Sequence, residues 1–464
     1  MLRGELLLYE ATIDTKSQGG EALPGWVERS VFWHIYPLGF VGAEPQLTAD
    51  AIVTHRLRRL IGWLDYAVEL GASALLLAPI FASSTHSYDT IDHFRIDPRL
   101  GEEEDFNALI AAAHAKGLRV VLDGVFNHVG RDFPRFQRAI ASRANTDDAA
   151  WFRLAWPVNS AGMSEPDYAT FEGHAQLVAL NHDASEVADY VTRVMNHWLD
   201  RGADGWRLDA AYAVPRSFWH KVLPLVRARH PDAYIFGEVI HGDYAGFVRE
   251  TGVDAVTQYE LWKAIWSALN DRNFFELAWA LERHNALLDS FVPQTFIGNH
   301  DVTRIASQLK DERHLAHALA ILMTIAGTPS IYAGDEQAFR GIKEHRAGGD
   351  DAIRPAFPAA PDGLAPFGWP VYRLHQLLIG LRRRHPWLHC ARSRMVELHN
   401  TDVVIEASCG SSRLWTALNV SDAPVTRTVP AAAQSIAGEL AVHRKDQVTD
   451  VVIPAHGFGI LAPR

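Results

Sequence analysis

Acidic, basic and imidazole side chains recur at the ends of short apolar runs in this 464-residue chain. They are Asp123, Asn127 and His128, Arg207 and Asp209, Glu238, Asn299, His300 and Asp301, and Asp335 with Glu336. A single Asp after a strand is most often a helix cap or a turn former. Arg207, however, stands two residues before Asp209, and side chains two apart on a strand share a face. We therefore expect the arginine to keep this carboxylate ionised and nucleophilic.

Three of these carboxylates match the chemistry of glycosidic bond cleavage. That reaction needs an ionised group to attack the anomeric carbon, a protonated group to serve the leaving oxygen, and negative charge near an oxocarbenium-like transition state. Asp209, Glu238 and Asp301 follow three different apolar runs and supply this set. A retaining mechanism requires the first two carboxyl groups to be about 5 Å apart, and neighbouring barrel strands lie about 4.8 Å apart.

Eight apolar runs would position these residues. They cover residues 31–36, 73–80, 118–125, 204–210, 233–239, 255–260, 295–301 and 328–336. The runs alternate with amphipathic helical stretches, a pattern typical of βα units and a parallel sheet. Eight in series predict an α/β fold of the (β/α)8 barrel type, in which the chemistry lies at the C-terminal ends of the strands.

Two stretches depart from the βα repeat. Residues 129–182 carry Gly, Pro, Asn and aromatic clusters and predict an inserted, loop-rich subdomain after the third strand. From residue 388, short alternating runs separated by turn residues predict a C-terminal antiparallel β-domain. The predicted domains are therefore a catalytic barrel at 1–128 and 183–387, the insertion at 129–182, and the β-domain at 388–464.

Composition excludes several classes of function. The net charge of −11 argues against a protein that tracks nucleic-acid phosphates. The longest apolar stretches are far shorter than the roughly 20 residues that span a membrane. The first residues show no small-residue cleavage site, so we expect a cytoplasmic protein. Cys390 and Cys409 allow one bridge at most, and we expect buried free thiols.

Four ordered strings resemble the signature regions of the α-amylase family of glycoside hydrolases. They are DGVFNH (123–128), GWRLDA (205–210), GEV (237–239) and FIGNHD (296–301). The stretch SYDTIDHFRIDPRLG (87–101) is similar to the family's substrate-binding loop. Within the family, residues 202–239 and the VFWHIYPLGF start resemble the neopullulanase and cyclomaltodextrinase group.

The resemblance implies a role for each matching residue. Asp209 would be the nucleophile, Glu238 the general acid/base, and Asp301 the group that stabilises the transition state. The implied substrate-binding residues are Tyr88, which would stack on a sugar ring, Asp89, near the charge network, His128, Arg207, His300, and the pair Asp350 and Arg354. The implied substrates are malto-oligosaccharides with α-1,4 bonds, cyclic or short ones such as cyclodextrins or cyclic maltosyl-maltose, with α-1,6 bonds left open.

Departures from the family pattern leave the metal and the oligomer open. Ala210, Ala211 and Tyr212 stand where the family usually has a Lys-His pair, which removes a common calcium contact. Asn127 remains as a calcium contact, so calcium stays open and no cofactor is required. Members of the group usually carry an N-terminal β-domain that helps to build a dimer. Only about 30 residues precede the first strand here, so a homodimer also stays open.

Other functions stay under consideration. An α-glucan transglycosylase or an α-glucosidase would use the same residues, because a second sugar can replace water as the acceptor. A catalytically silent sugar-binding relative is the non-enzyme alternative, and the presence of all three carboxylates weighs against it. A metal-dependent amidohydrolase would need a His-x-His pair on the first strand, where His34 is followed by Ile35 and Tyr36.

Overall fold

Eight parallel strands form a closed barrel in the computed structural model, which describes residues 23–464 apart from 49, 143–145, 157, 160, 161, 164, 165 and 347. They are β1 (Phe32–Ile35), β2 (Ala74–Leu77), β5 (Arg119–Gly124), β13 (Gly205–Leu208), β14 (Tyr234–Gly237), β15 (Ala255–Val256), β16 (Gln294–Phe296) and β17 (Thr328–Tyr332). Their order in the sheet is β15-β14-β13-β5-β2-β1-β17-β16. A parallel bridge between Thr257 and Gln294 joins the two edges. Each predicted run contains one strand, and the (β/α)8 prediction is confirmed.

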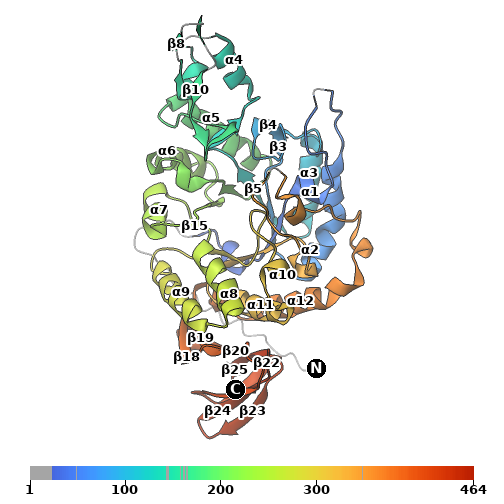
Figure 1. Cartoon of the computed structure of the whole chain (residues 1–464), viewed down its shortest axis with the longest axis vertical. Coiled ribbons are helices and arrows are strands. Elements are labelled where there is room, and N and C mark those ends of the chain that lie inside the picture. Colours follow the sequence, from blue (N-terminus) through green and yellow to red (C-terminus); the bar gives the residue numbers. More distant parts are fainter. Residues whose placement is uncertain are drawn as a thin grey trace, which may run out of the picture.

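Helices surround this barrel (Figure 1). They are α1 (Pro37–Phe40), α2 (Leu64–Leu70), α3 (Glu103–Ala115), α5 (Ser185–Leu199), α6 (Arg216–Arg227), α7 (Tyr244–Thr251), α8 (Tyr259–Asp271), α9 (Phe274–Leu287), α10 (Ile305–Gln308), α11 (Leu315–Thr324) and α12 (Trp369–Arg384). Helix α3 shows why they form. A reciprocal capping box between Glu102 and Asp105 satisfies its first backbone N–H groups, and Phe106, Leu109 and Ile110 face the core.

The chain between β5 and α5 leaves the barrel. It begins with β6 (His128–Gly130), which pairs with β12 (His174–Ala179), and β12 pairs with β11 (Thr170–Phe171). The rest comprises α4 (Pro134–Ser142), the pair β7 (Leu154–Ala155) and β10 (Asp167–Tyr168), and the pair β8 (Val158–Asn159) and β9 (Gly162–Met163). Figure 1 shows this insertion at one end of the molecule's long axis. It is more regular than predicted, because all of its strands except the six-residue β12 have two or three residues and are too short to show a sequence period.

The chain ends in two antiparallel sheets at the opposite end of the long axis (Figure 1). One contains β18 (Arg392–Leu398), β19 (Asp402–Cys409), β20 (Ser412–Asn419), β25 (Phe458–Pro463) and β22 (Ala433–Gly438). The other contains β21 (Val425–Val429), β24 (Val448–Ile453) and β23 (Ala441–Lys445). A separate apolar cluster that includes Trp415, Val451 and Leu461 fills the C-terminal domain. The predicted β-domain is confirmed.

Two further expectations concern the cysteines and membranes. Cys390 and Cys409 are free and half-buried rather than fully buried, with their sulfur atoms 3.8 Å apart. Their thiols lie where η10 (Pro386–Cys390) passes the end of β19. Among the described residues, no helix has the length and apolar character needed to cross a membrane.

Candidate active site

A single buried guanidinium organises the C-terminal ends of the barrel strands. Arg207 on β13 is the register partner of Asp123 on β5, and its Nη1 lies 2.5 Å from Oδ2 of that aspartate. Its Nη2 lies 2.9 Å from Oε1 of Glu238. Longer contacts reach Asp209 at 3.3 Å and Asp301 at 4.0 Å. The structure thus brings together the three predicted carboxylates and adds Asp123 as a fourth.

The barrel hydrogen bonds fix Asp209 and Glu238 as neighbours. Each residue directly follows its strand, and the Asp209 N–H donates to the Gly124 carbonyl at 3.0 Å. The Glu238 N–H donates to the Leu208 carbonyl at 2.9 Å. Because Leu208 and Gly237 are register partners, the two carboxylates start from adjacent points of adjacent strands. Adjacent strands are about 4.8 Å apart.

The protonation of Asp209 differs from the expectation that Arg207 keeps it ionised. Burial, followed by repulsion from Glu238, raises the pKa of Asp209 well above its usual range, although Arg207 opposes the rise. The reason lies in the geometry, since the two closest contacts of the guanidinium go to Asp123 and Glu238. Burial and this repulsion therefore favour the protonated form of Asp209 in the ligand-free site.

Besides its contact with Arg207, Glu238 accepts hydrogen bonds from two further donors. The Tyr259 hydroxyl donates to Oε1 at 3.0 Å, and the Asn299 amide donates to that hydroxyl at 2.9 Å. The Ala210 N–H donates to Oε2 at 2.9 Å. Ala210 has φ of +44°, a left-handed conformation that is costly for a residue with a side chain and that turns this N–H toward the carboxylate. Sequence reasoning missed Tyr259, whose only signal is that it follows β15 and begins α8.

One guanidinium and one imidazole hold the Asp301 carboxylate in place. Arg354 Nη2 lies 3.0 Å from its Oδ1, and His300 Nε2 lies 2.9 Å from its Oδ2. Although burial opposes ionisation, His300, Arg354 and Arg207 hold the pKa of Asp301 well below its usual range. Arg354 also contacts Asp350 at 3.0 Å, so the predicted pair does reach this site. Asp301 is therefore the carboxylate that stays ionised.

Among the other predicted binding residues, Tyr88 and His128 contact residues elsewhere in the site, whereas Asp89 is bound within its own loop. The Tyr88 hydroxyl donates to Asp123 at 3.0 Å and hydrogen-bonds His300, whose ring stacks on that of Tyr88 with centroids 5.2 Å apart. His128 stacks on Phe171 of the insertion at 4.7 Å. Asp89 was expected near the charge network, yet both of its carboxylate oxygens accept hydrogen bonds from Thr85, at 3.1 and 2.7 Å. A carboxylate four residues after a hydroxyl stabilises its own loop in this way, and a role of Asp89 at the sugar site stays a prediction.

A pocket of about 340 Å³ lies between the barrel and the insertion. Its lining includes Asn127, Arg153, Phe171, Glu172, Leu180, His182 and Tyr212. The Tyr212 hydroxyl donates to Glu172 at 3.0 Å, so the residue three after Asp209 contacts the insertion.

The surroundings of Asn127 fit calcium poorly. Its amide nitrogen contacts His128 Nδ1 at 3.1 Å. The described lining of the pocket offers one carboxylate, Glu172, together with the cation Arg153. Calcium takes six to eight oxygen ligands and favours several carboxylates. The mechanism proposed for this site therefore uses no calcium ion.

Comparisons with known proteins agree with this arrangement. The family model described as Alpha amylase, catalytic domain, matches residues 34–362. A cyclomaltodextrinase from Geobacillus thermopakistaniensis is 33% identical over 343 residues, which cover 68% of this chain and 57% of that relative. The chain thus matches less than two thirds of that relative's length.

Solved structures match over a larger share of both chains. The debranching enzyme of Nostoc punctiforme superposes with a TM-score of 0.80 at 26% identity, covering 95% of this chain and 99% of that one. A cyclic alpha-maltosyl-(1→6)-maltose hydrolase from Arthrobacter globiformis superposes with a TM-score of 0.79 at 27% identity. That match covers 95% of this chain and 100% of the other.

Proposed function

The chain belongs to the alpha-amylase family of glycoside hydrolases, and from that membership we propose that it cleaves α-glucosidic bonds of short or cyclic malto-oligosaccharides with retention of configuration. The observation that carries this proposal is the convergence of Asp209, Glu238 and Asp301 on Arg207. The carboxylates come from β13, from β14 and from the loop after β16. Adjacent strand ends supply the roughly 5 Å separation of nucleophile and acid/base that retention needs.

The first chemical step forms a covalent intermediate. Ionised Asp209 attacks the anomeric carbon, the bond to the leaving oxygen breaks, and protonated Glu238 gives its proton to that oxygen. The product is a glycosyl ester of Asp209 and an ionised Glu238. In the second step Glu238 removes a proton from water, and the resulting hydroxyl displaces Asp209. Each cycle thus returns the proton to Glu238 and the negative charge to Asp209.

Asp301 supplies fixed negative charge near the developing oxocarbenium ion. Its two oxygens are occupied by Arg354 and His300, so the carboxylate is oriented before substrate arrives. Fixed charges that need no reorganisation are the most effective stabilisers of a transition state. Tyr88 and His128 complete the proposed sugar site. The Tyr88 ring stacks on His300, and the His128 ring stacks on Phe171.

Similarity to the Arthrobacter globiformis enzyme supports a cyclic or α-1,6-containing substrate. That enzyme's described activity is hydrolysis of cyclic alpha-maltosyl-(1→6)-maltose, and the two chains match over nearly their whole lengths. Transglycosylation is the second candidate activity, because the pocket beside Tyr212 offers space for an acceptor sugar. An α-glucosidase would release single glucose units from the same intermediate.

Product analysis on linear, cyclic and α-1,6-branched glucooligosaccharides tests the substrate. Release of linear maltose units from a cyclic tetrasaccharide supports the proposal, while products longer than the substrate identify a transglycosylase. Absence of turnover on the whole panel would favour a catalytically silent sugar-binding protein and refute the proposed hydrolase activity. Size-exclusion chromatography of the full chain distinguishes the monomer from the homodimer that we leave open.

Variants test the roles of the two carboxylates. Asp209→Asn and Glu238→Gln should each lower turnover by about 10³-fold or more, whereas Asp271→Asn, at an exposed ion pair with Lys310, should not. Azide can replace the missing group in Asp209→Ala and should give a glycosyl azide of inverted configuration. In Glu238→Ala it should give a retained product. Identical azide products, or full activity in either amide variant, would overturn the assignment.

A further inference from the structure

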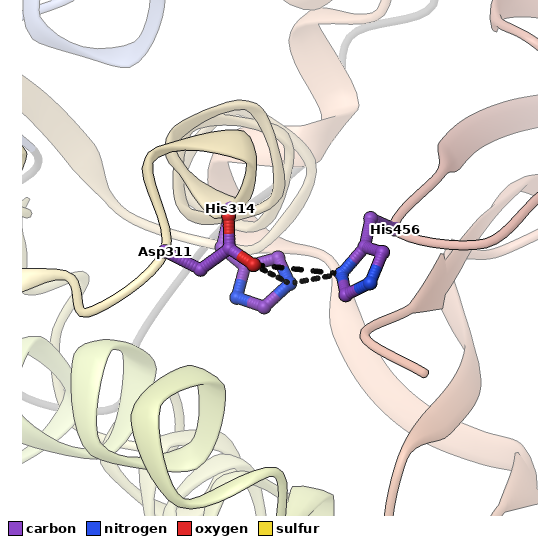
Figure 2. A group of neighbouring side chains, drawn as sticks. All are labelled: Asp311, His314 and His456. Carbon is purple, nitrogen blue, oxygen red and sulfur yellow. Dashed lines mark hydrogen bonds and ion pairs between the residues drawn. The ribbon is translucent and has the colours of Figure 1, made fainter. Parts of the chain in front are cut away.

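A second polar cluster lies where the barrel meets the C-terminal domain. Asp311 precedes η5 (Glu312–His314), which ends in His314 and continues into α11, while His456 comes from the loop between β24 and β25. The two histidines are 142 residues apart in the chain. Figure 2 shows the carboxylate and both rings pointing toward one another from these two segments.

The distances within the cluster are those of ligands around an ion. His314 Nε2 lies 3.0 Å from His456 Nδ1, and Asp311 Oδ2 lies 3.7 Å from His456 Nδ1 and 4.0 Å from His314 Nε2. A point equidistant from the corners of such a triangle lies about 2.1 Å from each, which is the usual distance from zinc to imidazole nitrogen or carboxylate oxygen. A hydrogen bond between the two histidines accounts for the 3.0 Å contact but not for the position of the carboxylate. The carboxylate is too far for a hydrogen bond to either ring but at the right distance for a shared cation.

A fourth residue prepares His456 to act as a ligand. Asp422 Oδ1 lies 2.8 Å from Nε2 of that histidine, so the ring donates its proton there and presents a bare Nδ1 to the cluster. Histidines that bind metals usually donate their other ring N–H to a carboxylate in this way.

We propose that Asp311, His314 and His456 bind a zinc ion that joins the barrel to the C-terminal β-domain. Two imidazoles and one carboxylate favour zinc over calcium or magnesium, which prefer oxygen ligands. The His314 and His456 side chains are only 2% and 5% exposed, so the ion would be largely shielded from solvent. Arg313 also contacts Asp311, and Arg272 contacts Asp422, so each carboxylate carries a cationic neighbour that tempers the affinity.

The ion would reinforce an interface that already exists. His317 Nε2, one turn along α11, hydrogen-bonds the Asn419 carbonyl of β20 at 3.0 Å, and Thr324 bonds Thr416 of the same strand. Zinc would add a cross-link at the start of α11. Its expected effect is on the stability of the domain contact, because the catalytic carboxylates are bound by other residues.

Zinc titration of the full chain tests the site. After chelator treatment, calorimetry with ZnCl2 should show a binding event that calcium chloride does not reproduce. At a hundredfold excess over Kd, zinc should raise the Tm by roughly 3–5 °C. Cobalt in place of zinc should give visible absorption typical of low coordination. His314→Ala and His456→Ala should lose the event and the Tm shift, while turnover of malto-oligosaccharides persists.

A matched control comes from another group of candidate ligands. His55, Glu102 and Asp105 also lie within ligand distance of one another. Asp105 is bound by Arg58 and caps α3, much as Asp311 is bound by Arg313 and caps η5, but His55 is half exposed whereas the side chains of His314 and His456 are buried. His55→Ala should therefore keep the event. Asp422→Asn, which leaves the three ligands in place, should weaken zinc about 10–100-fold. Unchanged zinc affinity in both His314→Ala and His456→Ala, or loss of the event in His55→Ala alone, would overturn the proposal.

Discussion

Replacing Tyr259 with phenylalanine tests whether Glu238 is the proton donor. The Tyr259 hydroxyl donates to Glu238 Oε1 at 3.0 Å, and in the proposed mechanism that carboxylate becomes ionised as the leaving oxygen takes its proton. The hydrogen bond therefore strengthens as the glycosylation step proceeds. Tyr259→Phe keeps the ring, which packs against Phe296 with centroids 4.9 Å apart, and removes the hydroxyl that donates to Glu238 and accepts from the Asn299 amide.

The size of the effect follows from the charge on the acceptor. A hydrogen bond to a charged group contributes about 1.5–3 kcal/mol. Since about 1.4 kcal/mol corresponds to a tenfold change in rate, full loss of the bond in the transition state would lower kcat/KM about 10- to 150-fold. A substrate with a highly acidic leaving group needs little protonation. For a nitrophenyl glycoside we therefore expect less than a threefold change.

The assay compares kcat/KM for a malto-oligosaccharide and a nitrophenyl α-maltoside, because this parameter reports only steps through glycosylation. Tyr234→Phe is the matched control, since that buried tyrosine of β14 directs its hydroxyl to Gln294, 3.5 Å away, and not to a catalytic carboxylate. The control should leave the ratio of the two substrates unchanged. An equal loss on both substrates in Tyr259→Phe would show that the tyrosine does not act through proton donation, and our assignment of Glu238 would fail.

Three further predictions follow from other contacts. Arg354→Lys should lower kcat/KM about 10–100-fold, because one ammonium cannot hold Asp301 and Asp350 and also bond the His300 carbonyl. Burial raises the pKa of Glu336 from 4.5 to about 7, so the folded state keeps a proton that the unfolded chain releases. Stability should therefore fall by up to about 3 kcal/mol as pH rises from about 4.5 to 7. Thermal unfolding should show a smaller fall in Glu336→Gln than in the wild type, because Asp123 and Asp335, whose pKa values are also raised, remain in the variant. Calcium chelation by EGTA should leave turnover unchanged, and a loss restored by calcium would show that the pocket at Asn127 holds the ion.

The barrel was predictable because its signal is local. Strands buried on both faces appear as continuous aliphatic runs; seven barrel strands fall within such runs, and β16 begins one residue before its run. The position of Asp209, Glu238 and Asp301 was equally predictable, since residues directly after parallel strands meet at one end of a barrel.

The contacts between elements were not predictable from the same patterns. Tyr259 reaches Glu238 only because β14 and β15 are neighbours and α8 starts at their end. Which carboxylates Arg207 contacts depends on side-chain directions. Its shorter contacts with Asp123 and Glu238 therefore had no sequence signature. The zinc cluster is a more extreme case, because its histidines come from segments that meet only after the two domains dock.

The arrangement of charges explains how a neutral sugar can be activated. Arg207 is closest to Asp123, and Arg354 contacts Asp301, so each guanidinium has a carboxylate partner. Arg207 also contacts Glu238, and with Asp209 ionised and Glu238 protonated, as the proposed mechanism requires, these two residues carry a single negative charge in a buried site. That charge gains little from a neutral ground state but much from the positive charge of an oxocarbenium-like transition state. Removing either guanidinium would leave further carboxylates unpaired and favour their protonation, so the arginines are needed to keep the charge of the site at the value that the reaction uses.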